Sequence, residues 1–227
     1  MNSWSKKLNS VNNKVNIILF GPPGAGKGTQ ARFIVNKYNY FQLSTGDLLR
    51  NETKKKSSLG IEIEDLISTG KFVSDEIVNK LLKQSIINLK FRDRIIFDGY
   101  PRNIDQAKTL EKILKEFNQS IGQIIFLNVD RNTIEKRIMG RMTCDKCNMT
   151  LNEFYNKSEI ELHPCGKEFL TKRKDDNLET VINRYETYMQ TTKPVLDFYS
   201  KNEKFTEIDG NSEIEQITSK INDILRV

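Results

Sequence analysis

The chain has 227 residues, and its 36 lysines and arginines exceed its 30 aspartates and glutamates to give a formal net charge of +6. This length allows one well-packed core with insertions, and no apolar run approaches the roughly 20 residues that cross a bilayer. The basic residues are interleaved with acidic ones rather than gathered in one patch, which favours a small, strongly anionic ligand over nucleic acid. We therefore expect a soluble protein with no nucleic-acid partner and no membrane partner.

Residues 1–14 lack the apolar segment of a secretory signal, and we expect a flexible N-terminal tail there. The three cysteines all lie between Cys144 and Cys165. Such clustering favours a metal site over a disulfide framework and is typical of a reducing compartment. We expect a cytoplasmic protein, with a mitochondrial location as the alternative.

Residues 15–29 read VNIILFGPPGAGKGT. The apolar run 15–20 predicts a buried strand, and residues 27–38 predict a helix with one apolar face. Between them, Gly21, Gly26 and Lys27 match the phosphate-binding pattern G-x-x-x-x-G-K, the P-loop. Glycines let backbone N–H groups surround phosphate oxygens, the helix N-terminus attracts anions, and the lysine adds a mobile charge. Gly28 departs from the general pattern and moves the hydroxyl to Thr29; a turn without a ligand is the alternative interpretation.

The rest of the chain alternates strands and helices. Further strands are predicted at 41–43, 94–98, 123–129 and 205–208, and helices at 104–118, 133–139, 179–202, 212–226 and from Ser74 onward. Strands that are apolar throughout are buried on both faces, as in a parallel sheet. The fold class is therefore α/β, a doubly wound parallel sheet of five strands. Residues 44–73 and 140–176 fall outside this alternation and are predicted to be insertions near the carboxyl ends of the strands, where such sheets bind ligands.

Polar residues with phosphate chemistry follow the predicted strands. Asp98 ends a buried strand near Thr29, and a carboxylate there can hold Mg²⁺ through its waters; a turn cap is the alternative role. Arginines are numerous for a chain whose usual cation is lysine, and arginine is the better bidentate clamp for phosphate. The arginines singled out are Arg50, Arg102, Arg137, Arg141, Arg173 and Arg184.

Together these residues resemble the adenylate kinase family in its long-lid form. Four motifs in order carry the resemblance: GPPGAGKGTQ at 21–30, LSTGDLLR at 43–50, FDGYPRNIDQ at 97–106 and RKDD at 173–176. The resemblance implies Mg²⁺-dependent transfer of the terminal phosphoryl group of ATP to AMP, giving two ADP, by a monomeric enzyme. It also implies a core of residues 1–43, 74–139 and 177–227, with a mobile AMP-binding insertion at 44–73 and a mobile lid at 140–176.

Specific contacts follow from the same resemblance, with Gln106 assigned to the adenine edge because an amide presents a donor and an acceptor together. ATP would be bound by Gly24, Ala25, Gly26, Lys27, Gly28, Thr29, Arg137, Arg141, Thr150, Leu151 and Ser212. AMP would be bound by Thr45, Arg50, Lys71, Phe72, Val73, Gly99, Tyr100, Pro101, Arg102, Gln106, Arg173 and Arg184. The catalytic set would be Lys27, Arg102, Arg137, Arg141, Arg173 and Arg184, with Asp98 and Thr29 holding Mg²⁺ through water. Asp175 and Asp176 would pair with arginines and steer lid closure.

The cysteines of the lid predict a structural zinc site. Cys144 and Cys147 have the C-x-x-C spacing of half a tetrahedral site, and Cys165 follows. The fourth ligand is His163 or Glu168: the glutamate keeps the spacing that a second pair has in relatives, and the histidine is the better zinc ligand. The metal would close a loop that has no core of its own. Three free thiols are the alternative.

Two other functions remain open at this stage. A GTP:AMP phosphotransferase shares almost every motif, because the donor base is contacted mostly by backbone. A non-catalytic nucleotide sensor on the same fold is more remote, since loss of Lys27, Arg102 or the lid arginines would favour it and none is lost.

Overall fold

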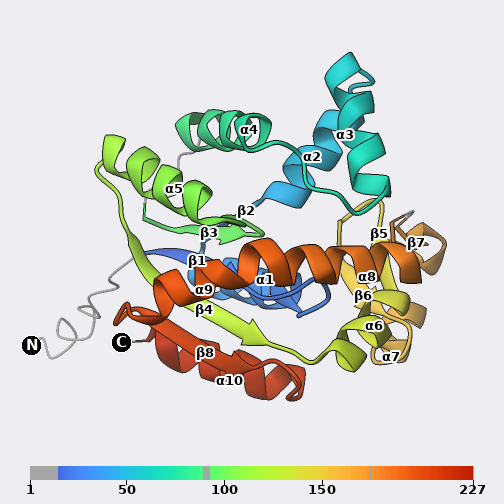
Figure 1. The fold of residues 1–227 in the computed structure, drawn as a ribbon. Coiled ribbons are helices and arrows are strands. Elements are labelled where there is room, and N and C mark those ends of the chain that lie inside the picture. The colour runs from blue at the N-terminus through green and yellow to red at the C-terminus, as the bar shows by residue number, and fades with distance from the viewer. Residues whose placement is uncertain (1–14, 89–92, 174, 227) are drawn as a thin grey trace, which may run out of the picture.

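The computed structural model describes residues 15–88, 93–173 and 175–226, so the predicted tail at 1–14 lies outside the described residues. Its centre is a five-stranded parallel sheet in the order β2-β3-β1-β4-β8, which confirms the predicted fold class (Figure 1). The strands are β1 (Asn16–Phe20), β2 (Phe41–Ser44), β3 (Ile95–Asp98), β4 (Ile121–Asn128) and β8 (Phe205–Asp209).

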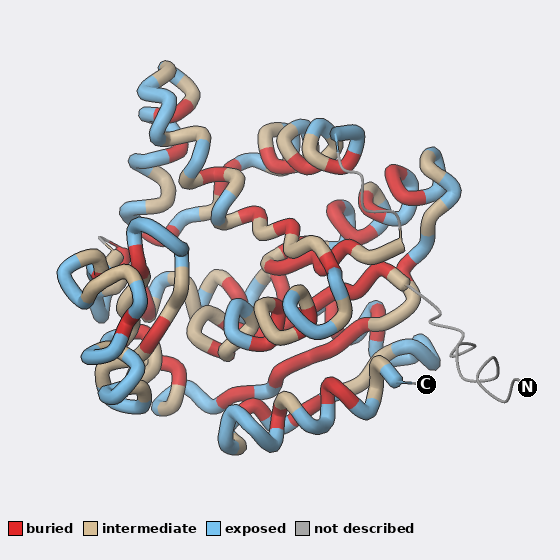
Figure 2. Tube along the Cα trace, turned by 180° about the vertical axis from the view of Figure 1, so that it is seen from behind, coloured by how far each residue is buried: buried red, intermediate tan, exposed pale blue. Residues whose placement is uncertain are grey.

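Helices cover both faces of this sheet, which is why the central strands are apolar throughout. In β1, Ile18 and Phe20 pack into one cluster and Ile17 and Leu19 into the other. The first cluster is covered by α4 (Asp75–Asn88), α5 (Ile104–Glu116) and α9 (Lys193–Ser200). The second is covered by α1 (Lys27–Tyr38), α6 (Arg131–Met139), α8 (Leu178–Thr187) and α10 (Ile214–Leu225). Buried residues therefore concentrate in the strands and on the inner sides of the helices (Figure 2).

The helix predicted over 179–202 is interrupted. A π-helical turn, η2 (Tyr188–Thr192), separates α8 from α9. Pro194 stands in the first turn of α9, and because proline has no N–H, it cannot donate the bond that would continue a regular helix through this point. The apolar spacing alone did not reveal this break.

The two predicted insertions lie at one end of the molecule (Figure 1). The first contains α2 (Thr45–Thr53) and α3 (Ser58–Ser68), and α3 begins where the Ser57 side chain accepts a hydrogen bond from Gly60 N. The second has an antiparallel sheet in the order β6-β5-β7. Its elements are β5 (Arg141–Cys144), β6 (Thr150–Asn152), α7 (Lys157–Glu161), η1 (Lys167–Phe169) and β7 (Leu170–Thr171).

The lid was expected to have no core, and this expectation is wrong. Cys144, Leu151 and Leu170 are buried together, one from each strand of the lid sheet. Three residues make a small core, however, so packing alone gives this segment little stability.

Candidate active site

A large cavity lies at the carboxyl ends of the central strands, with a volume of about 1160 Å³. Its wall is formed by the loop between β1 and α1, the insertion with α2 and α3, the lid sheet, and core residues that follow β3 or lie on α8 and α10. Ligand pockets in proteins usually measure about 300–1,000 Å³. This cavity therefore has room for more than one small ligand.

The P-loop forms one side of the cavity. Gly24 and Gly26 have φ values of 78° and 91°, a backbone conformation that side chains with a Cβ avoid. A Cβ at Gly24 would lie 2.9 Å from Ile138 Cγ1, whereas a Cβ at Gly26 would meet nothing within 4 Å. The backbone at Gly26 is thus open toward the cavity, where a phosphate can approach its N–H groups.

Lys27 folds back over this loop. Its Nζ donates to the carbonyl oxygens of Gly21 at 2.8 Å and Pro22 at 3.0 Å. Burial lowers the pKa of Lys27 to about 8, and the Asp98 carboxylate opposes part of that decrease. An anionic ligand beside the amine would raise the pKa again and restore the full charge.

Asp98 ends β3 and is 9% exposed, with its Oδ2 accepting a hydrogen bond from Gln42 Nε2 at 2.8 Å. Thr29, in the first turn of α1, lines the same cavity. Carboxylate and hydroxyl oxygens are the ligands that Mg²⁺ prefers, directly or through its waters. The donor set therefore fits a hydrated Mg²⁺ ion that arrives with a phosphate ligand.

All six arginines that the sequence predicted line the cavity, and they come from the core and from both insertions. Arg102 is held by its Nε donating to Gly99 O at 2.8 Å and lies 4.6 Å from the centre of the Phe72 ring. Burial, together with the nearby Arg184, lowers the pKa of Arg102 to about 10. Burial and nearby Arg141 lower the pKa of Arg173, also to about 10. Buried arginines that repel one another along the cavity wall indicate a site that binds a polyanion.

Two of these arginines are paired at the end of the lid. Arg141 Nε donates to Asp176 Oδ2 at 2.8 Å, and Arg184 forms an ion pair with Asp175. Burial alone would raise the pKa of Asp175, but the adjacent Arg184 lowers it overall. The predicted pairing of both aspartates with arginines is confirmed, whereas their effect on lid closure stays a prediction.

Four predicted contact residues do not line the cavity: Thr45, Tyr100, Gln106 and Ser212. Thr45 Oγ1 donates to Gly99 O at 2.8 Å, and Tyr100 Oη donates to Asn79 Oδ1 at 2.5 Å. Gln106 is 3% exposed; its Oε1 accepts from Arg102 N and its Nε2 donates to Asp75 Oδ1, both at 2.7 Å. Thr45 and Gln106 thus contact the turn that carries Arg102, Tyr100 anchors that turn to α4, and Ser212 contacts Asp209 at the end of β8. The nucleotide contacts of all four residues stay predictions.

Gln42 and Asp75 contact predicted site residues, yet no motif pointed to them. In the sequence, Gln42 is simply a polar residue in the short strand β2. Asp75 is an acidic residue in the first turn of α4, where acidic residues are common. Their roles depend on partners 56 and 31 residues away in the chain, which no local pattern encodes.

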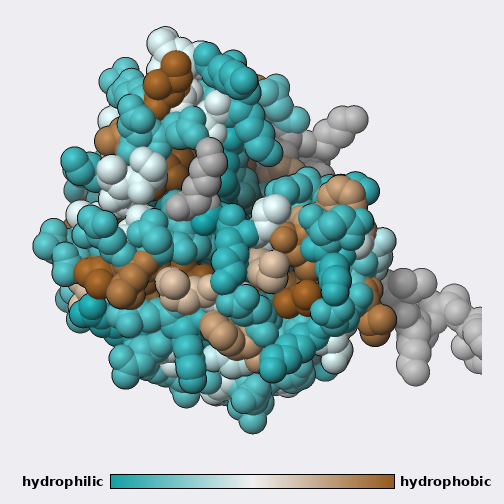
Figure 3. Space-filling model, turned by 90° about the vertical axis from the view of Figure 1, so that its right-hand side faces the viewer, coloured by the Kyte–Doolittle hydropathy of each residue, from teal (hydrophilic) through white to brown (hydrophobic). Residues whose placement is uncertain are grey.

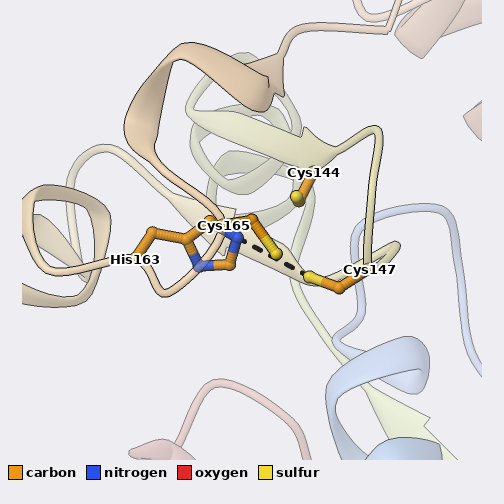
Figure 4. A group of neighbouring side chains, drawn as sticks. All are labelled: Cys144, Cys147, His163 and Cys165. Atoms are coloured by element: carbon orange, nitrogen blue, oxygen red, sulfur yellow. Dashed lines mark hydrogen bonds between the residues drawn. The ribbon is translucent and has the colours of Figure 1, made fainter.

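The lid brings a cluster of candidate metal ligands together (Figure 4). The ligand atoms of Cys144, Cys147, His163 and Cys165 lie within 4.8 Å of one another, and Cys147 Sγ is 3.6 Å from His163 Nε2. Zinc bonds of about 2.3 Å to sulfur and about 2.0 Å to nitrogen, at tetrahedral angles, place those atoms roughly 3.5 Å apart. Glu168, the alternative fourth ligand, is exposed and is not in this group. The structure therefore gathers a Cys₃His donor set that fits zinc.

A parallel sheet with a P-loop at its carboxyl edge, facing converging arginines, defines a nucleotide-binding phosphotransferase of the P-loop class. A family model described as adenylate kinase matches residues 19–204. An adenylate kinase of Pelagibacter ubique is 74% identical over 94% of this chain and 100% of the relative. Adenylate kinases of Mycoplasma capricolum and Fusobacterium nucleatum are 40% and 43% identical, covering 94% and 93% of this chain and 100% and 98% of those relatives. The chain belongs to the adenylate kinase family, as its four motifs predicted.

Proposed function

We propose that the protein catalyses the reversible transfer of the terminal phosphoryl group of ATP to AMP, giving two ADP. One observation carries the proposal: a single cavity joins the P-loop to six arginines from the core, the first insertion and the lid. A cavity of about 1160 Å³ exceeds the usual size for one small ligand, as two nucleotides require. The match to named adenylate kinases supports the choice of substrates.

The residues of the cavity serve this reaction by positioning and by charge. Phosphoryl transfer needs two nucleotides held in line and stabilisation of the charge that moves, without a protein nucleophile. The P-loop and Lys27 would bind the donor phosphates, while the arginines clamp both nucleotides and the transferring group. When bound with ATP, Mg²⁺ neutralises phosphate charge, and Asp98 and Thr29 are the residues that would hold it.

The two insertions would divide the substrates. Residues 44–73 would enclose AMP, and residues 140–176 would cover ATP and exclude water, so that ATP is not hydrolysed. Lid closure of this kind is the known behaviour of adenylate kinases. The residue contacts assigned from the family motifs belong to this proposal, including those of Thr45, Tyr100, Gln106 and Ser212, which do not line the cavity in this structure.

A coupled assay tests the function, supplying ATP or GTP as donor against AMP, UMP or CMP. We expect turnover with ATP and AMP, and its loss in Arg102→Met, with the exposed Lys108→Met as the matched charge control. Strong turnover with GTP alone would favour the GTP:AMP phosphotransferase. No turnover with any pair would favour a nucleotide sensor.

We also propose that Cys144, Cys147, His163 and Cys165 hold a structural zinc ion. Among the described residues, the lid core has three buried apolar side chains. A metal that joins β5 and its following turn to the segment between α7 and η1 would therefore add stability that packing does not supply. Elemental analysis should find about one zinc per chain. The His163→Ala variant should lose the metal and unfold its lid at lower temperature, whereas Glu168→Gln should retain it. Zinc in equal amount in both variants would contradict this ligand set.

The proposed enzyme is monomeric and cytoplasmic. On the face shown in Figure 3, hydrophilic side chains predominate and the apolar ones occur in small groups, which favours a monomer. Its cysteines are free rather than disulfide-bonded. No helix among the described residues is long and apolar enough to cross a membrane. Light scattering of the purified protein tests the oligomeric state.

A further inference from the structure

A hydrogen bond connects the far end of the lid to the helix of the P-loop. Arg32 lies on α1, five residues after Lys27, and its Nη2 donates to the carbonyl oxygen of Asn148 at 2.9 Å. Asn148 belongs to the turn that joins β5 to β6, 116 residues away in the chain. In Figure 4 the blue N-terminal ribbon passes beside the Cys147 end of this turn.

The position of this contact distinguishes it from the other links between the lid and the core. Where the structure describes both partners, the other hydrogen bonds that connect residues 140–176 with the rest of the chain end on α6 or α8. They join Gly140 to Lys136, Asn152 to Arg137, Lys172 to Met139, and Asp175 to Arg184. These contacts lie where the lid enters and leaves the core. Of the hydrogen bonds between described residues that connect the lid with the core, the one from Arg32 is the one that reaches the tip of the lid, at the turn between β5 and β6.

The acceptor is positioned by the turn itself. Asn148 has φ 56°, and its N–H donates to Cys144 O at 2.9 Å, so the turn fixes the direction of the Asn148 carbonyl. Arg32, Cys147 and Asn148 all line the same cavity as the P-loop. The bond itself is exposed, so it contributes the modest stability of an ordinary hydrogen bond to the closed position of the lid.

We propose that Arg32 is a positioning residue that holds the tip of the lid over the P-loop. With the tip held, β5 keeps Arg141 facing the donor phosphates, while Arg32 itself need not touch the nucleotide. This inference rests on the proposed function, in which the lid covers ATP. It assigns to a helix residue outside every family motif a part in donor binding.

Four variants separate this role from a structural one. Arg32→Met keeps the length of the side chain and removes its donors, and Arg32→Lys keeps the charge with a different reach. Asn148→Gly removes only the side chain, because glycine keeps the carbonyl and accepts the positive φ. Lys108→Met removes an exposed cation on α5, away from the lid.

Two measurements are made on each full-length variant. Single-molecule energy transfer between dyes on unnatural amino acids at Leu162 of the lid and Lys220 of α10, both exposed, reports the closed fraction without nucleotide. Steady-state kinetics gives kcat and the KM for each substrate. The closed fraction should fall in Arg32→Met, and its KM for ATP should rise roughly fivefold to tenfold, the effect of losing one ordinary, exposed hydrogen bond.

The other three variants test whether the effect comes from the hydrogen bond that Arg32 donates. Arg32→Lys should lie between Arg32→Met and the unaltered enzyme, and Asn148→Gly and Lys108→Met should match the unaltered enzyme. An unchanged closed fraction in Arg32→Met, or equal rises in the KM for ATP and for AMP, would overturn the proposal. Failure of the proposed function would appear separately, as absence of turnover in the unaltered enzyme, and the energy-transfer result would still decide the role of Arg32.

Discussion

At the scale of single residues, Lys27 has the most informative environment. Its amine is buried against the loop it serves, and burial lowers its pKa from 10.5 to about 8. The unfolded chain therefore binds this proton more tightly than the folded one. Consequently, Lys27 makes the free energy of unfolding rise as the pH increases from about 8 to about 10.5.

The same pKa predicts the pH dependence of donor binding. In the free enzyme Lys27 loses its charge as the pH rises through about 8, so kcat/KM for ATP should fall on that alkaline side. Lys27→Arg keeps a charge at every pH tested and should lower the maximum while moving the decrease to higher pH. Steady-state rates from pH 6 to 10 measure this. A decrease at the same pH in Lys27→Arg would show that another group titrates.

Residues within motifs were the predictable part of the site. Gly26, Lys27 and Asp98 line the cavity because P-loop spacing and the end of a strand fix their positions. The six arginines, whose roles the family resemblance implied, line it too. Gln42, Asp75 and Arg32 were not predicted, since each acts through a partner on a distant segment. Local sequence carries information on backbone shape, whereas these contacts arise only when the segments pack.

At the scale of elements, the first residue of α4 supports the start of α5. Asp75 Oδ1 accepts from Gln106 Nε2, and its Oδ2 accepts from Asn103 Nδ2, both at 2.7 Å. Gln106 in turn accepts a hydrogen bond from Arg102 N. The carboxylate can only accept and the Arg102 N–H can only donate, so the two partners together fix the orientation of the Gln106 amide.

Replacing this carboxylate should weaken both stability and AMP binding. Asp75→Ala leaves the buried Gln106 amide without its acceptor, which costs about 1–3 kcal/mol of unfolding free energy. The KM for AMP should rise more than the KM for ATP, because the disturbed turn carries Arg102. Denaturant unfolding and steady-state kinetics measure the two effects. Asp105→Ala removes an exposed acid from the same turn of α5 and should change neither; equal effects in both variants would refute the assigned support.

Long or well-buried helices and strands could be predicted from the sequence, whereas short ones could not. The five strands and the long helices followed from apolar patterns, whereas the lid strands have only two to four residues. Such strands are too short to show a period. They are held by pairing with one another and by the side chains of Cys144, Leu151 and Leu170, neither of which can be inferred from a local pattern.

At the scale of the whole molecule, the core and the insertions meet through charge. Burial lowers the pKa values of Arg102 and Arg173 to about 10, and the neighbouring arginines add to the decrease. The ligand-free protein therefore carries unfavourable repulsion there. A polyanion that binds across the cavity would relieve this repulsion and join the insertions to the core. Binding of such a ligand would therefore favour closure of the two insertions over the core.

The ion pair between Asp175 and Arg184 joins the end of the lid to α8, and it predicts how the molecule responds to acid. Burial raises the pKa of Asp175, but the charge and hydrogen bond of Arg184, together with the nearby Arg141, bring it below its ordinary value of 3.8. The pair therefore contributes stability that is fully present above the unfolded pKa and is lost as the pH falls through the folded one. Both side chains are largely buried, with exposed fractions of 9% and 18%.

Asp175→Asn should thus lower the free energy of unfolding at pH 7 by about 1–3 kcal/mol, since it leaves a largely buried guanidinium without its charge partner. The difference from the unaltered protein should shrink as the pH falls below about 4, where the unaltered protein also loses the pair. Denaturant unfolding at pH 7, 5 and 3.5 measures it. Glu116→Gln breaks the exposed Lys83–Glu116 pair and should cost less than about 1 kcal/mol. A constant difference at every pH would mean that Asp175 acts through packing rather than through its charge.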